Sequence, residues 1–551
     1  MLESSILPSI IAVTLALSVV GNLTSSPHDV MNIFSSSKPL PYTSDPFHLL
    51  LSEIWLFARC STPNFHGYYG LLSIIWPLWP WRSGALDELY PFSLGNLWAD
   101  LWHFFLFVLQ VGFIIFVPLS AFTGLPIPPL LATPAFILSF IGFILVNQLV
   151  CTIFLDGPPA RIFISAGPHD SYSAHPDDPD HFKRLISAKA AHKGERWVFI
   201  NGVAVGSHWL DSNLKRLVAT FRRPILGIHN ATYGIPFDVL ECMIQRTFCF
   251  PTLDIRTAYT TISSLLSDKS VTKLVLIAHS QGSIEAGMVL DWLYSTLSTA
   301  EVSKLEVYTF GNASNHWNNP ISEDGLPVIK HIEHYANEYD WVSRFGILHF
   351  RPLSIKARAE GEHTTALRKA ATSPITTKTK TVVNGADGSP AQGIKKALSN
   401  PTISTTIQAT AGPARSSTAS LEAALAAPHR FAGRLFLRHA SGHQFNQHYL
   451  DNIFPMSYDS DGRLDEVNDH VASFISLPVD EAALASDNVV KPYPGRGSNG
   501  SGRKIKDLSY LWKYVNGKVP DNEVHGQPRW AGRVAGRKEV TLQSPMEYVT
   551  G

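Results

Sequence analysis

Charged side chains are scarce in this sequence. Asp, Glu, Lys and Arg make up 16% of its 551 residues, whereas hydrophobic residues make up 45%. Because soluble domains carry about 25% charged residues, we expect part of the chain to lie in lipid. The formal net charge is zero, and this balance gives no reason to expect a nucleic-acid partner.

Cysteine is also scarce, which excludes a fold held together by many disulfides. The sequence contains Cys60, Cys151, Cys242 and Cys249. Cys242 and Cys249 could pair, but a reducing compartment is the simpler interpretation. No Cys/His cluster has zinc spacing, and the G-x-G-x-x-G match at 495–500 has neither a strand before it nor a helix after it. We therefore predict no metal and no cofactor.

Charge is absent altogether between residues 101 and 155. A membrane-spanning helix needs about 20 apolar residues, so this stretch holds two spans, at 101–122 and 131–154. The segment TGLPIPP at 123–129 separates them, and so short a break predicts a helical hairpin with both outer ends on one side. Two buried core helices are the alternative, but such a charge-free length is rare in soluble cores.

Two further apolar segments extend the expected membrane region over residues 1–160. The run at 6–21 contains Pro8 and lacks a basic segment before it, so it is a signal peptide, a signal anchor or a further span. The segment LLSIIWPLWPW at 71–81 is too short to span. Its tryptophans suit the interface between lipid and water.

The orientation of the hairpin follows from the basic residues beside it. The nearest basic residue before the hairpin is Arg82, whereas those that follow it are Arg161, Lys183, Arg184, Lys189, Lys193 and Arg196. Flanks rich in Lys and Arg remain in the cytosol. We therefore predict an integral membrane protein, of the endoplasmic reticulum or another endomembrane, with its remaining chain in the cytosol. A cleaved signal peptide would reverse this orientation.

Aromatic residues are absent from a long segment near the C-terminal third. Residues 356–429 contain no Phe, Trp or Tyr, and nine Lys or Arg against four Asp or Glu. Such a segment cannot bury enough apolar surface to fold alone, so we predict a disordered insertion. Residues 485–551 are polar and carry eleven Lys or Arg against six Asp or Glu, which favours a mostly disordered basic tail. Anionic lipids are a possible contact for such a tail.

A different pattern begins at Arg196, after an expected linker at 161–195. Short apolar runs of the strand type alternate with helical spacing, which predicts an α/β fold with a mostly parallel sheet and helices on both faces. We place this domain at 196–355 and 430–484. The strands are expected in WVFING (197–202), PILGIHNATYG (224–234), KLVLIAHS (273–280), KLEVYTFGN (304–312), IKHIEHYANEYD (329–340) and GRLFLRHASGH (433–443).

Ser280 occupies a turn between an expected strand and an expected helix, in the sequence AHSQG. A nucleophile elbow requires small residues two before and two after the serine, and here they are Ala278 and Gly282. Ala278 departs from the G-x-S-x-G pattern but is still small. The turn also places the Gln281 N–H at a helix N-terminus, where it can face a developing oxyanion. An ordinary serine-containing turn is the alternative.

A catalytic serine needs a base, and the base needs an acid that orients it. In this architecture the chain order is Ser, then Asp or Glu, then His. Asp340 follows an expected strand end and is preferred over Glu338 and Glu333, although it could merely cap the turn. His443 lies in a loop after the last expected strand.

Two other histidines compete with His443 for the role of base. His439 falls within the expected strand and His448 within the helix that follows. Asp340 and His443 are 103 residues apart, and removing the 74-residue insertion leaves 29, which suits one helix and one strand. The second oxyanion donor is expected from the backbone of Gly202 and Val203, after the first strand.

These stretches together resemble the α/β-hydrolase superfamily, and residues 197–455 are similar to fungal lipase-like serine esterases. The resemblance rests on FINGVAVG, GIHNATYGIPFDVLECMIQR, IAHSQGS, YTFGNASNHW, HYANEYDWVSRFG and SGHQFNQHYLD. It implies Ser280, Asp340 and His443 as a catalytic triad and ester bonds, of acyl lipids, as substrates.

The sequence therefore predicts a membrane-anchored serine hydrolase that cleaves carboxylic esters through an acyl-enzyme. Two alternatives remain open. One is a catalytically inactive hydrolase fold that serves as a membrane scaffold, which the departures at Ala278 and Asn201 keep open. The other is a thioesterase that acts on S-acyl groups.

Overall fold

A computed structural model describes most of the region from residue 39 to residue 520. The described residues are 39–40, 42, 44–63, 68–122, 129–157, 162–167, 170–174, 194–351, 431–458, 460, 464–468, 473–494 and 502–520. The predicted run at 6–21 and the predicted insertion at 356–429 lie outside them. The described residues all belong to one compact unit, formed by residues 1–352 and 430–551.

The N-terminal part of the unit is helical. Its elements are α3 (Pro46–Ser61), η1 (Gly70–Ile74), η2 (Gly84–Leu86), α4 (Leu94–Phe122), α5 (Pro129–Cys151) and the short π-helix η3 (Thr152–Asp156). Asp45 caps α3 by accepting hydrogen bonds from two backbone N–H groups of its first turn. By length and composition, Leu94–Ile115 and Ile137–Asp156 could each cross a membrane. The helical hairpin expected from the charge-free stretch therefore corresponds to α4 and α5.

The sheet is built from strands that alternate with helices. In chain order these elements are β1 (Ile162–Gly167), β2 (Asp170–Ala174), β3 (Glu195–Ile200), α7 (Ser207–Phe221), β4 (Ile225–Ile228), α8 (Ile235–Phe248), α9 (Leu253–Ser267), β5 (Lys273–His279), α10 (Gln281–Thr296), α11 (Thr299–Val302), β6 (Leu305–Phe310), β7 (His331–Asn337), α12 (Trp341–Phe345), α13 (Ile347–Phe350) and β8 (Arg434–Arg438).

Shorter elements complete the chain after β8. They are η5 (Phe445–Leu450), α16 (Asp451–Ile453), β9 (Met456–Tyr458), β10 (Leu464–Val467), η6 (Phe474–Ser476), α17 (Glu481–Asp487), β11 (Val489–Val490), η7 (Ile505–Asp507) and η8 (Leu511–Gly517).

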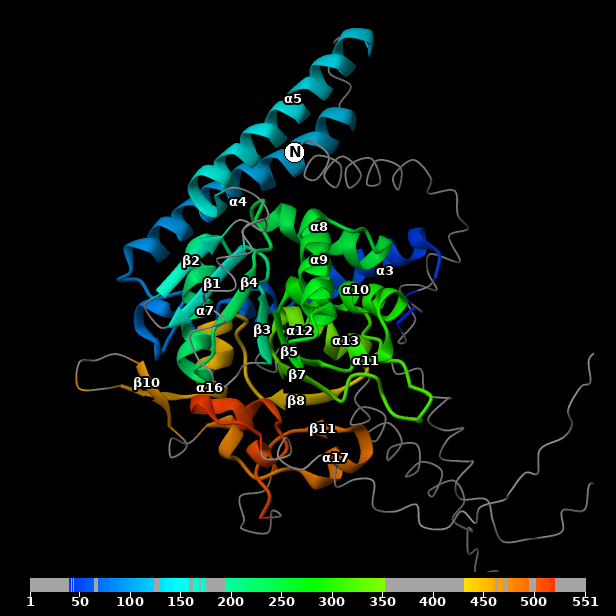
Figure 1. The fold of residues 1–551 in the computed structure, drawn as a ribbon. Coiled ribbons are helices and arrows are strands. Elements are labelled where there is room, and N and C mark those ends of the chain that lie inside the picture. The colour runs from blue at the N-terminus through cyan, green and yellow to red at the C-terminus, as the bar shows by residue number, and fades with distance from the viewer. Residues whose placement is uncertain are drawn as a thin grey trace, which may run out of the picture. The chain divides into compact units, whose positions relative to one another are not determined.

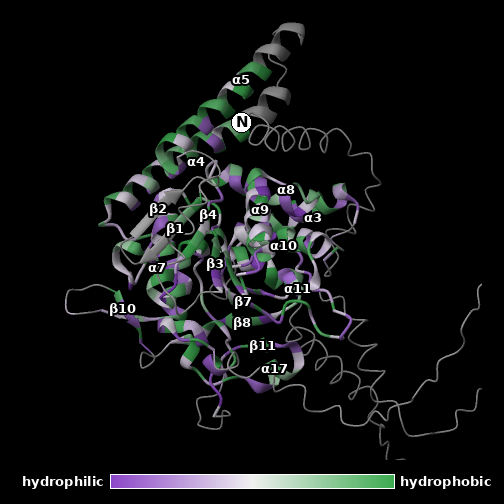
Figure 2. Ribbon diagram, viewed as in Figure 1, coloured by the Kyte–Doolittle hydropathy of each residue, from purple (hydrophilic) through white to green (hydrophobic). Residues whose placement is uncertain are grey.

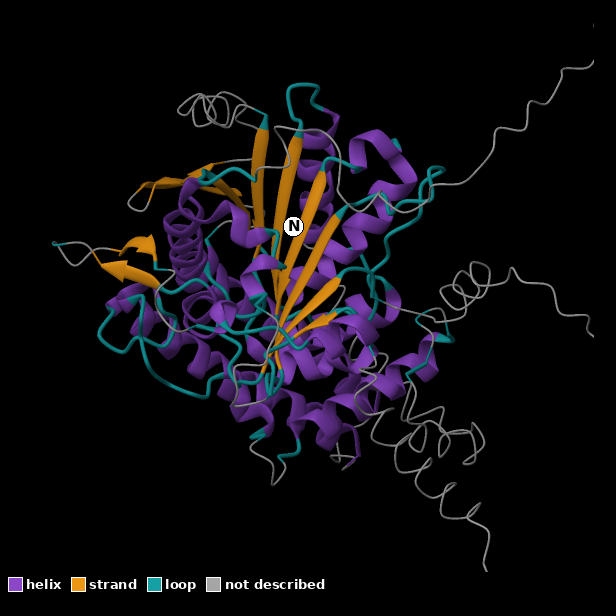
Figure 3. Ribbon diagram, turned by 90° about the horizontal axis from the view of Figure 1, so that it is seen from below, coloured by secondary structure: helices purple, strands orange, loops and turns teal. Residues whose placement is uncertain are grey.

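Nine strands form one sheet in the order β11-β8-β7-β6-β5-β3-β4-β1-β2. The pairs from β11 to β4 are all parallel, whereas β1 pairs antiparallel with both β4 and β2. The strands twist into a fan (Figure 3). The predicted α/β fold with a mostly parallel sheet is confirmed. Five of the six predicted strand segments contain one of its strands, and the segment at 197–202 overlaps β3, which begins at Glu195.

Helices cover both faces of this sheet (Figure 1). Because side chains alternate along a strand, β3 directs Trp197 and Phe199 to one face, in a core cluster with α7 and η8. Val198 and Ile200 are also fully buried and lie on the other face, where α10 contacts β3 and β5 and packs against α8 and α9. Both faces of the central strands are thus buried, as their continuous apolar runs require.

Two predicted boundaries are wrong. The expected linker at 161–195 contributes β1 and β2 to the edge of the sheet, because Ile162 and Phe163 bury their side chains there. The expected tail at 485–551 contributes β11 and η8, and Leu511 and Tyr514 are fully buried. A few large apolar side chains fix this polar, glycine-rich segment on the core.

The chain changes direction between β3 and β5. After β3 it continues through α7 to β4 on one side, and after β5 it continues through α10 to β6 on the other. The carboxyl ends of parallel strands at such a reversal form a crevice where ligands bind in α/β proteins. The Gly202 loop follows β3, and Ser280 follows β5, at this place.

Candidate active site

Ser280 has an unusual backbone conformation. It follows β5 directly, precedes the first residue of α10, and adopts φ 55° and ψ −123°. A non-glycine residue at positive φ is uncommon and costs about 1–3 kcal/mol. Its N–H donates to the Phe310 carbonyl at 3.0 Å, which holds the turn against β6. This strained strand-to-helix turn has the backbone geometry expected of a nucleophile elbow.

Two glycines make room for this turn. A Cβ on Gly202 would lie 2.4 Å from the Ser280 Cβ, and a Cβ on Gly282 would lie 2.5 Å from the Asn201 carbonyl oxygen. The loop after β3 and the start of α10 therefore touch backbone to backbone. The small residue predicted two positions after the serine has its physical reason in this contact.

Asp340 and His443 form a buried pair. His443 Nδ1 lies 2.8 Å from Asp340 Oδ2, and neither residue is more than 4% exposed. The same Oδ2 accepts hydrogen bonds from the hydroxyls of Tyr449 at 2.7 Å and Ser343 at 2.8 Å. The other oxygen accepts from the Val342 N–H at 2.9 Å. The Asp340 carboxylate is thus held in one orientation.

Electrostatics keeps Asp340 ionised. Burial by itself raises the pKa of this carboxyl, but the facing His443 and the hydrogen bonds that the carboxylate accepts outweigh it. The pKa of Asp340 therefore lies below its ordinary value. An ionised carboxylate at Nδ1 requires the proton of a neutral His443 ring to be on Nδ1, which leaves the lone pair on Nε2.

Two ring nitrogens of this site, His443 Nε2 and His279 Nδ1, are buried without a hydrogen-bond partner among the described residues. Of the two, His443 Nε2 belongs to the ring whose other nitrogen is held by the Asp340 carboxylate. Most buried polar atoms in native proteins have a partner. A buried basic nitrogen without one is ready to accept a proton.

The turn at Phe310 and Gly311 brings His443 and Ser280 to the same place. Phe310 accepts the Ser280 N–H, and a Cβ on Gly311 would lie 2.6 Å from His443 Cε1. His279, which precedes the serine, stacks on the His443 ring at a centroid distance of 4.6 Å. Its Nε2 lies 2.9 Å from the His443 carbonyl oxygen. Burial, with a smaller effect of His443, holds the pKa of His279 well below its ordinary value.

The competing residues have other partners. His439 is exposed and pairs with Glu338 at 2.7 Å. His448 contacts the Gln444 N–H and the Pro77 carbonyl, and Glu333 accepts the Tyr510 N–H at 2.6 Å. The structure therefore pairs Asp340 with His443 and stacks His443 on His279, the residue before Ser280, whereas these alternatives lie outside the pair. The Ser280 hydroxyl and His443 Nε2 are not joined by a hydrogen bond.

A chain of amides fixes the two predicted oxyanion donors. The Asn201 side chain donates to the carbonyls of Gly202 and Asn230 and accepts the Asn230 N–H. The Asn230 side chain in turn donates to Gln281 Oε1 at 2.9 Å. The loop of Gly202 and Val203 and the first residue of α10 are thus linked through Asn230, in the loop after β4. The asparagine at 201, a departure from the expected pattern, serves this link.

Sequence reasoning missed two contributors to the site. Tyr449 lies in η5 and completes the ring of donors around Asp340, but no motif marks it. The second contributor is the strap, residues 68–81, of which residues 71–81 were expected only at a lipid interface. Its Ser73 and Ile74 carbonyls accept the N–H groups of Gly442 and His443 at 2.9 and 2.8 Å, so it also positions the histidine loop.

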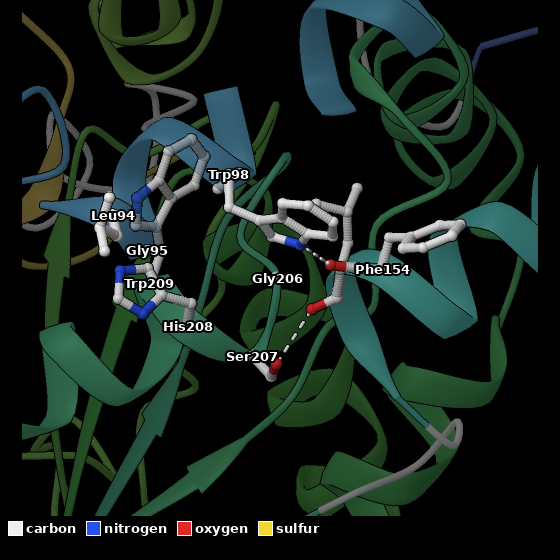
Figure 4. Close-up of a pocket in the computed structure, with 10 residues that line it drawn as sticks. Leu94, Gly95, Trp98, Phe154, Gly206, Ser207, His208 and Trp209 are labelled. Carbon is white, nitrogen blue, oxygen red and sulfur yellow. Dashed lines mark hydrogen bonds between the residues drawn. The ribbon is translucent and has the colours of Figure 1, made fainter. Parts of the chain in front are cut away.

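A pocket of about 470 Å³ lies elsewhere, where α4, η3 and α7 meet (Figure 4). Its lining includes Leu94, Trp98, Phe154, Gly206 and His208. In it the Trp98 indole donates to the Phe154 carbonyl at 3.1 Å. None of the predicted triad residues lines this pocket, so it is not assigned to the reaction.

No ligand set for a metal is present in the described part of the chain. All four cysteines are free thiols, so the pairing of Cys242 with Cys249 left open by the sequence is not formed. The side chains of this site can supply proton transfer and a nucleophilic hydroxyl.

Known proteins give little guidance for this chain. No protein-family model and no curated protein matches it. Among solved structures, a Trichoderma reesei cutinase in complex with a C11Y4 phosphonate inhibitor matches with a TM-score of 0.19 and 21% identity, over 34% of this chain and 82% of that one. A TM-score this low assigns neither a family nor an activity to this chain.

Proposed function

We propose that this chain is a membrane-anchored serine hydrolase of the α/β-hydrolase type that cleaves carboxylic esters, of acyl lipids, through Ser280, Asp340 and His443. The observation that carries the proposal is the His443 ring, with Nδ1 at 2.8 Å from a buried carboxylate and Nε2 buried without a partner among the described residues. The strained turn at Ser280 supports it independently.

The first half-reaction forms an acyl-enzyme. The Ser280 oxygen attacks the ester carbonyl carbon while its proton moves to His443 Nε2. The carbonyl π electrons move to oxygen, and the N–H groups of Gln281 and of Gly202 or Val203 donate to this oxyanion. When the oxyanion collapses, the bond to the alcohol oxygen breaks. The proton on Nε2 passes to the departing alcohol.

The second half-reaction hydrolyses the acyl-enzyme and regenerates the free Ser280 hydroxyl. Water gives a proton to His443 Nε2 and attacks the acyl carbon, and the Ser280 oxygen leaves with that proton. Asp340 stabilises the imidazolium in both halves and stays ionised. No cofactor is required by these steps.

The hairpin of α4 and α5 supplies the membrane anchor. Its helices are long and apolar enough to meet a bilayer. The basic residues that follow the hairpin favour a cytosolic position for the sheet and the helices packed on it, which are called the hydrolase unit below. Acyl lipid is the proposed substrate class because the anchor keeps the site close to lipid. An endomembrane such as the endoplasmic reticulum is the proposed location.

Labelling with a fluorophosphonate probe in membranes tests the proposal. The wild type should be labelled, and Ser280→Ala and His443→Ala should lose the label while keeping the wild-type thermal unfolding profile. His439→Ala is the matched control, because this exposed histidine pairs with Glu338 and should label normally. Loss of labelling in that control, or labelling of Ser280→Ala, would contradict the assignment.

One observation favours a second function, the catalytically inactive membrane scaffold. Ser280 is only 2% exposed and the strap is bonded to the histidine loop, so a substrate must displace part of the chain. A folded wild type that resists the probe in detergent and in vesicles would support the scaffold. If the probe does label, competition by a lipid ester against an acyl thioester separates the esterase from the thioesterase.

A further inference from the structure

Helix α4 buries three polar side chains and exposes one, Asp100, among its described side chains. Asn96, His103 and Gln110 are at most 4% exposed, and they lie on the side that faces the rest of the unit. By contrast, every exposed residue of α4 between Leu101 and Ile115 is apolar or glycine. In a helix on the surface of a soluble protein the apolar stripe faces the core, so the polarity of α4 is inverted.

Helix α5 repeats this inversion. Asn147 is buried, whereas Leu138, Val146 and Leu149 are all more than half exposed. Figure 2 shows both helices as strongly hydrophobic where they are coloured. An apolar surface shared by two helices in this way marks contact with lipid or with another protein.

The buried polar groups bind the hairpin to the hydrolase unit. Gln110 Nε2 donates to the Tyr233 carbonyl at 2.5 Å, and Asn147 Nδ2 donates to the same carbonyl at 2.9 Å. Near the other end of α4, Asn96 Oδ1 accepts the Trp209 indole N–H at 3.1 Å. The helix therefore lies along the hydrolase unit from Asn96 to Gln110 and does not stand upright on it.

The contact continues to Phe113 and Phe140, which belong to one cluster with Phe237 of α8. Beyond these two residues α4 has nine residues, to Phe122, and α5 has eleven, from Pro129. At about 1.5 Å per residue these arms reach about 14 and 17 Å. The hydrocarbon core of a bilayer is about 30 Å thick, so neither arm crosses it alone.

The hydrolase unit cannot enter the hydrocarbon core of the bilayer and so bring more of the hairpin into it. Helix α9 packs in the same layer as α8 and exposes Arg256, while Asp268 and Lys269 are exposed just after it. Charged side chains in hydrocarbon are costly. The side of the hairpin that faces this layer must therefore stay near the water.

We propose that the hairpin is a monotopic anchor, which lies along the surface of one membrane leaflet with its outer face in the acyl chains and does not cross the bilayer. This inference rests on the membrane anchoring in the proposed function, and it replaces the two crossings expected from composition. In this arrangement Leu101, Val108 and Ile115, which are seven residues apart on one helix face and 53–60% exposed, enter the leaflet to a similar depth.

Lipid is preferred over a second copy of the chain because the outer face of α4 lacks polar groups from Leu101 to Ile115. Protein interfaces carry a polar rim and about one hydrogen bond per 100–200 Å². None of the exposed side chains from Leu101 to Ile115 can donate or accept a hydrogen bond. A leaflet makes no such demand.

Depth measurements with nitroxide labels test the orientation. Leu101→Cys, Val108→Cys and Ile115→Cys are made one at a time with Cys249→Ser, because Cys249 is the exposed native thiol. Each labelled full-length chain is reconstituted into phosphatidylcholine–phosphatidylserine vesicles. Collision with oxygen and with a polar nickel complex then gives the depth. Ile321→Cys, which is exposed on the loop before β7, is the aqueous control.

The monotopic anchor predicts three depths within about 5 Å of one another. A crossing helix predicts steps of about 10 Å for each seven residues, and such a gradient would overturn the proposal. Labels that are shielded from oxygen and nickel alike, in a chain that sediments as a dimer, would assign the face to a second copy instead. Fluorophosphonate labelling of the same samples reports separately on Ser280, so failure of the hydrolase proposal leaves the depth result standing.

Discussion

The hairpin and the Ser280 site both bury polar side chains, but they treat them differently. Along the hairpin, Gln110 donates to Asn147 Oδ1 and to the Tyr233 carbonyl, and Asn147 donates to the same carbonyl, so their amide N–H groups are used. At the site, the Asp340 carboxylate accepts hydrogen bonds from the groups around it. His443 Nε2, by contrast, has no partner in the described part of the chain. Buried polar groups that are paired hold a structure together, and one that is left open can do chemistry.

Asp340→Asn gives the strongest test of this comparison. The amide would donate to His443 Nδ1, so the ring proton would move to Nε2 and the open nitrogen would lose its lone pair. We expect the second-order rate of fluorophosphonate labelling to fall by about 10⁴-fold. Glu338→Gln is the control, because its partner His439 is exposed. A loss below about tenfold would mean that Asp340 does not set the state of His443.

Gln110→Leu tests the hydrogen-bonded amides of the hairpin. The change removes two hydrogen bonds and leaves Asn147 Oδ1 without this donor, which should lower the free energy of unfolding by about 1–3 kcal/mol. Thermal or denaturant unfolding of the detergent-solubilised protein measures it. Leu109→Ala, on the exposed face of the same helix, should change the free energy of unfolding little. An equal loss there would show that the hydrogen bonds of Gln110 contribute no more than the exposed face.

Tyr449→Phe tests how much the Asp340 carboxylate depends on the hydroxyl groups that donate to it. Asp340 loses one of its hydroxyl donors, so its lowered pKa moves back up. A carboxyl with a lowered folded pKa contributes stability above its ordinary value, and that stability is lost as the pH falls through the folded pKa. We therefore expect the loss of stability on the acid side to begin at higher pH in this variant, as measured by denaturant unfolding between about pH 3 and about pH 6.

At neutral pH the same variant should lose about tenfold in labelling rate, or about 1.4 kcal/mol. The comparison variant is Ser343→Ala, which removes the other hydroxyl donor to the same oxygen and should act in the same direction. An unchanged acid-side loss of stability in both variants would mean that neither hydroxyl stabilises the Asp340 carboxylate, which would leave His443 and the Val342 N–H as its stabilising partners.

Glu285→Gln concerns a third kind of buried group. Both carboxylate oxygens of Glu285 lack a partner in the described part of the chain, and burial, with nearby Asp254 and Glu241, raises its pKa well above 4.5. The folded chain keeps this proton while the unfolded chain releases it. Stability therefore falls as the pH rises above 4.5 toward the folded pKa.

The glutamine has no proton to release, so it should flatten this dependence by up to about 1.4 kcal/mol per pH unit. Denaturant unfolding at about pH 5 and about pH 8 measures the slope for both chains. An identical slope would mean that Glu285 is ionised inside the fold and has an ion partner.

Much of the site could be predicted from the sequence because its signals are local. Strand, small residue, serine and glycine lie within ten residues of Ser280, and an elbow is a property of that short stretch. The pairing of Asp340 with His443 needed chain order and the removal of a 74-residue segment from the count. Whether these residues catalyse a reaction stays a prediction.

The edges of the fold could not be predicted in this way. β1 and β2 and the packed part of the C-terminal segment come from stretches whose composition is that of linkers. A few side chains, such as Ile162 and Tyr514, bury themselves against distant parts of the chain, and a window of neighbouring residues carries no record of such contacts. The same is true of Tyr449, whose partner lies 109 residues before it.

The sequence by itself determined that α4 and α5 are apolar helices and that Ser280 sits in a sharp turn, because periodicity, missing charge and small residues are local properties. Only the tertiary structure decided which side of α4 faces outward and which nitrogen of His443 is left open. Both depend on what stands opposite a side chain. For Gln110 it is the Tyr233 carbonyl, and for His443 Nδ1 it is the Asp340 carboxylate.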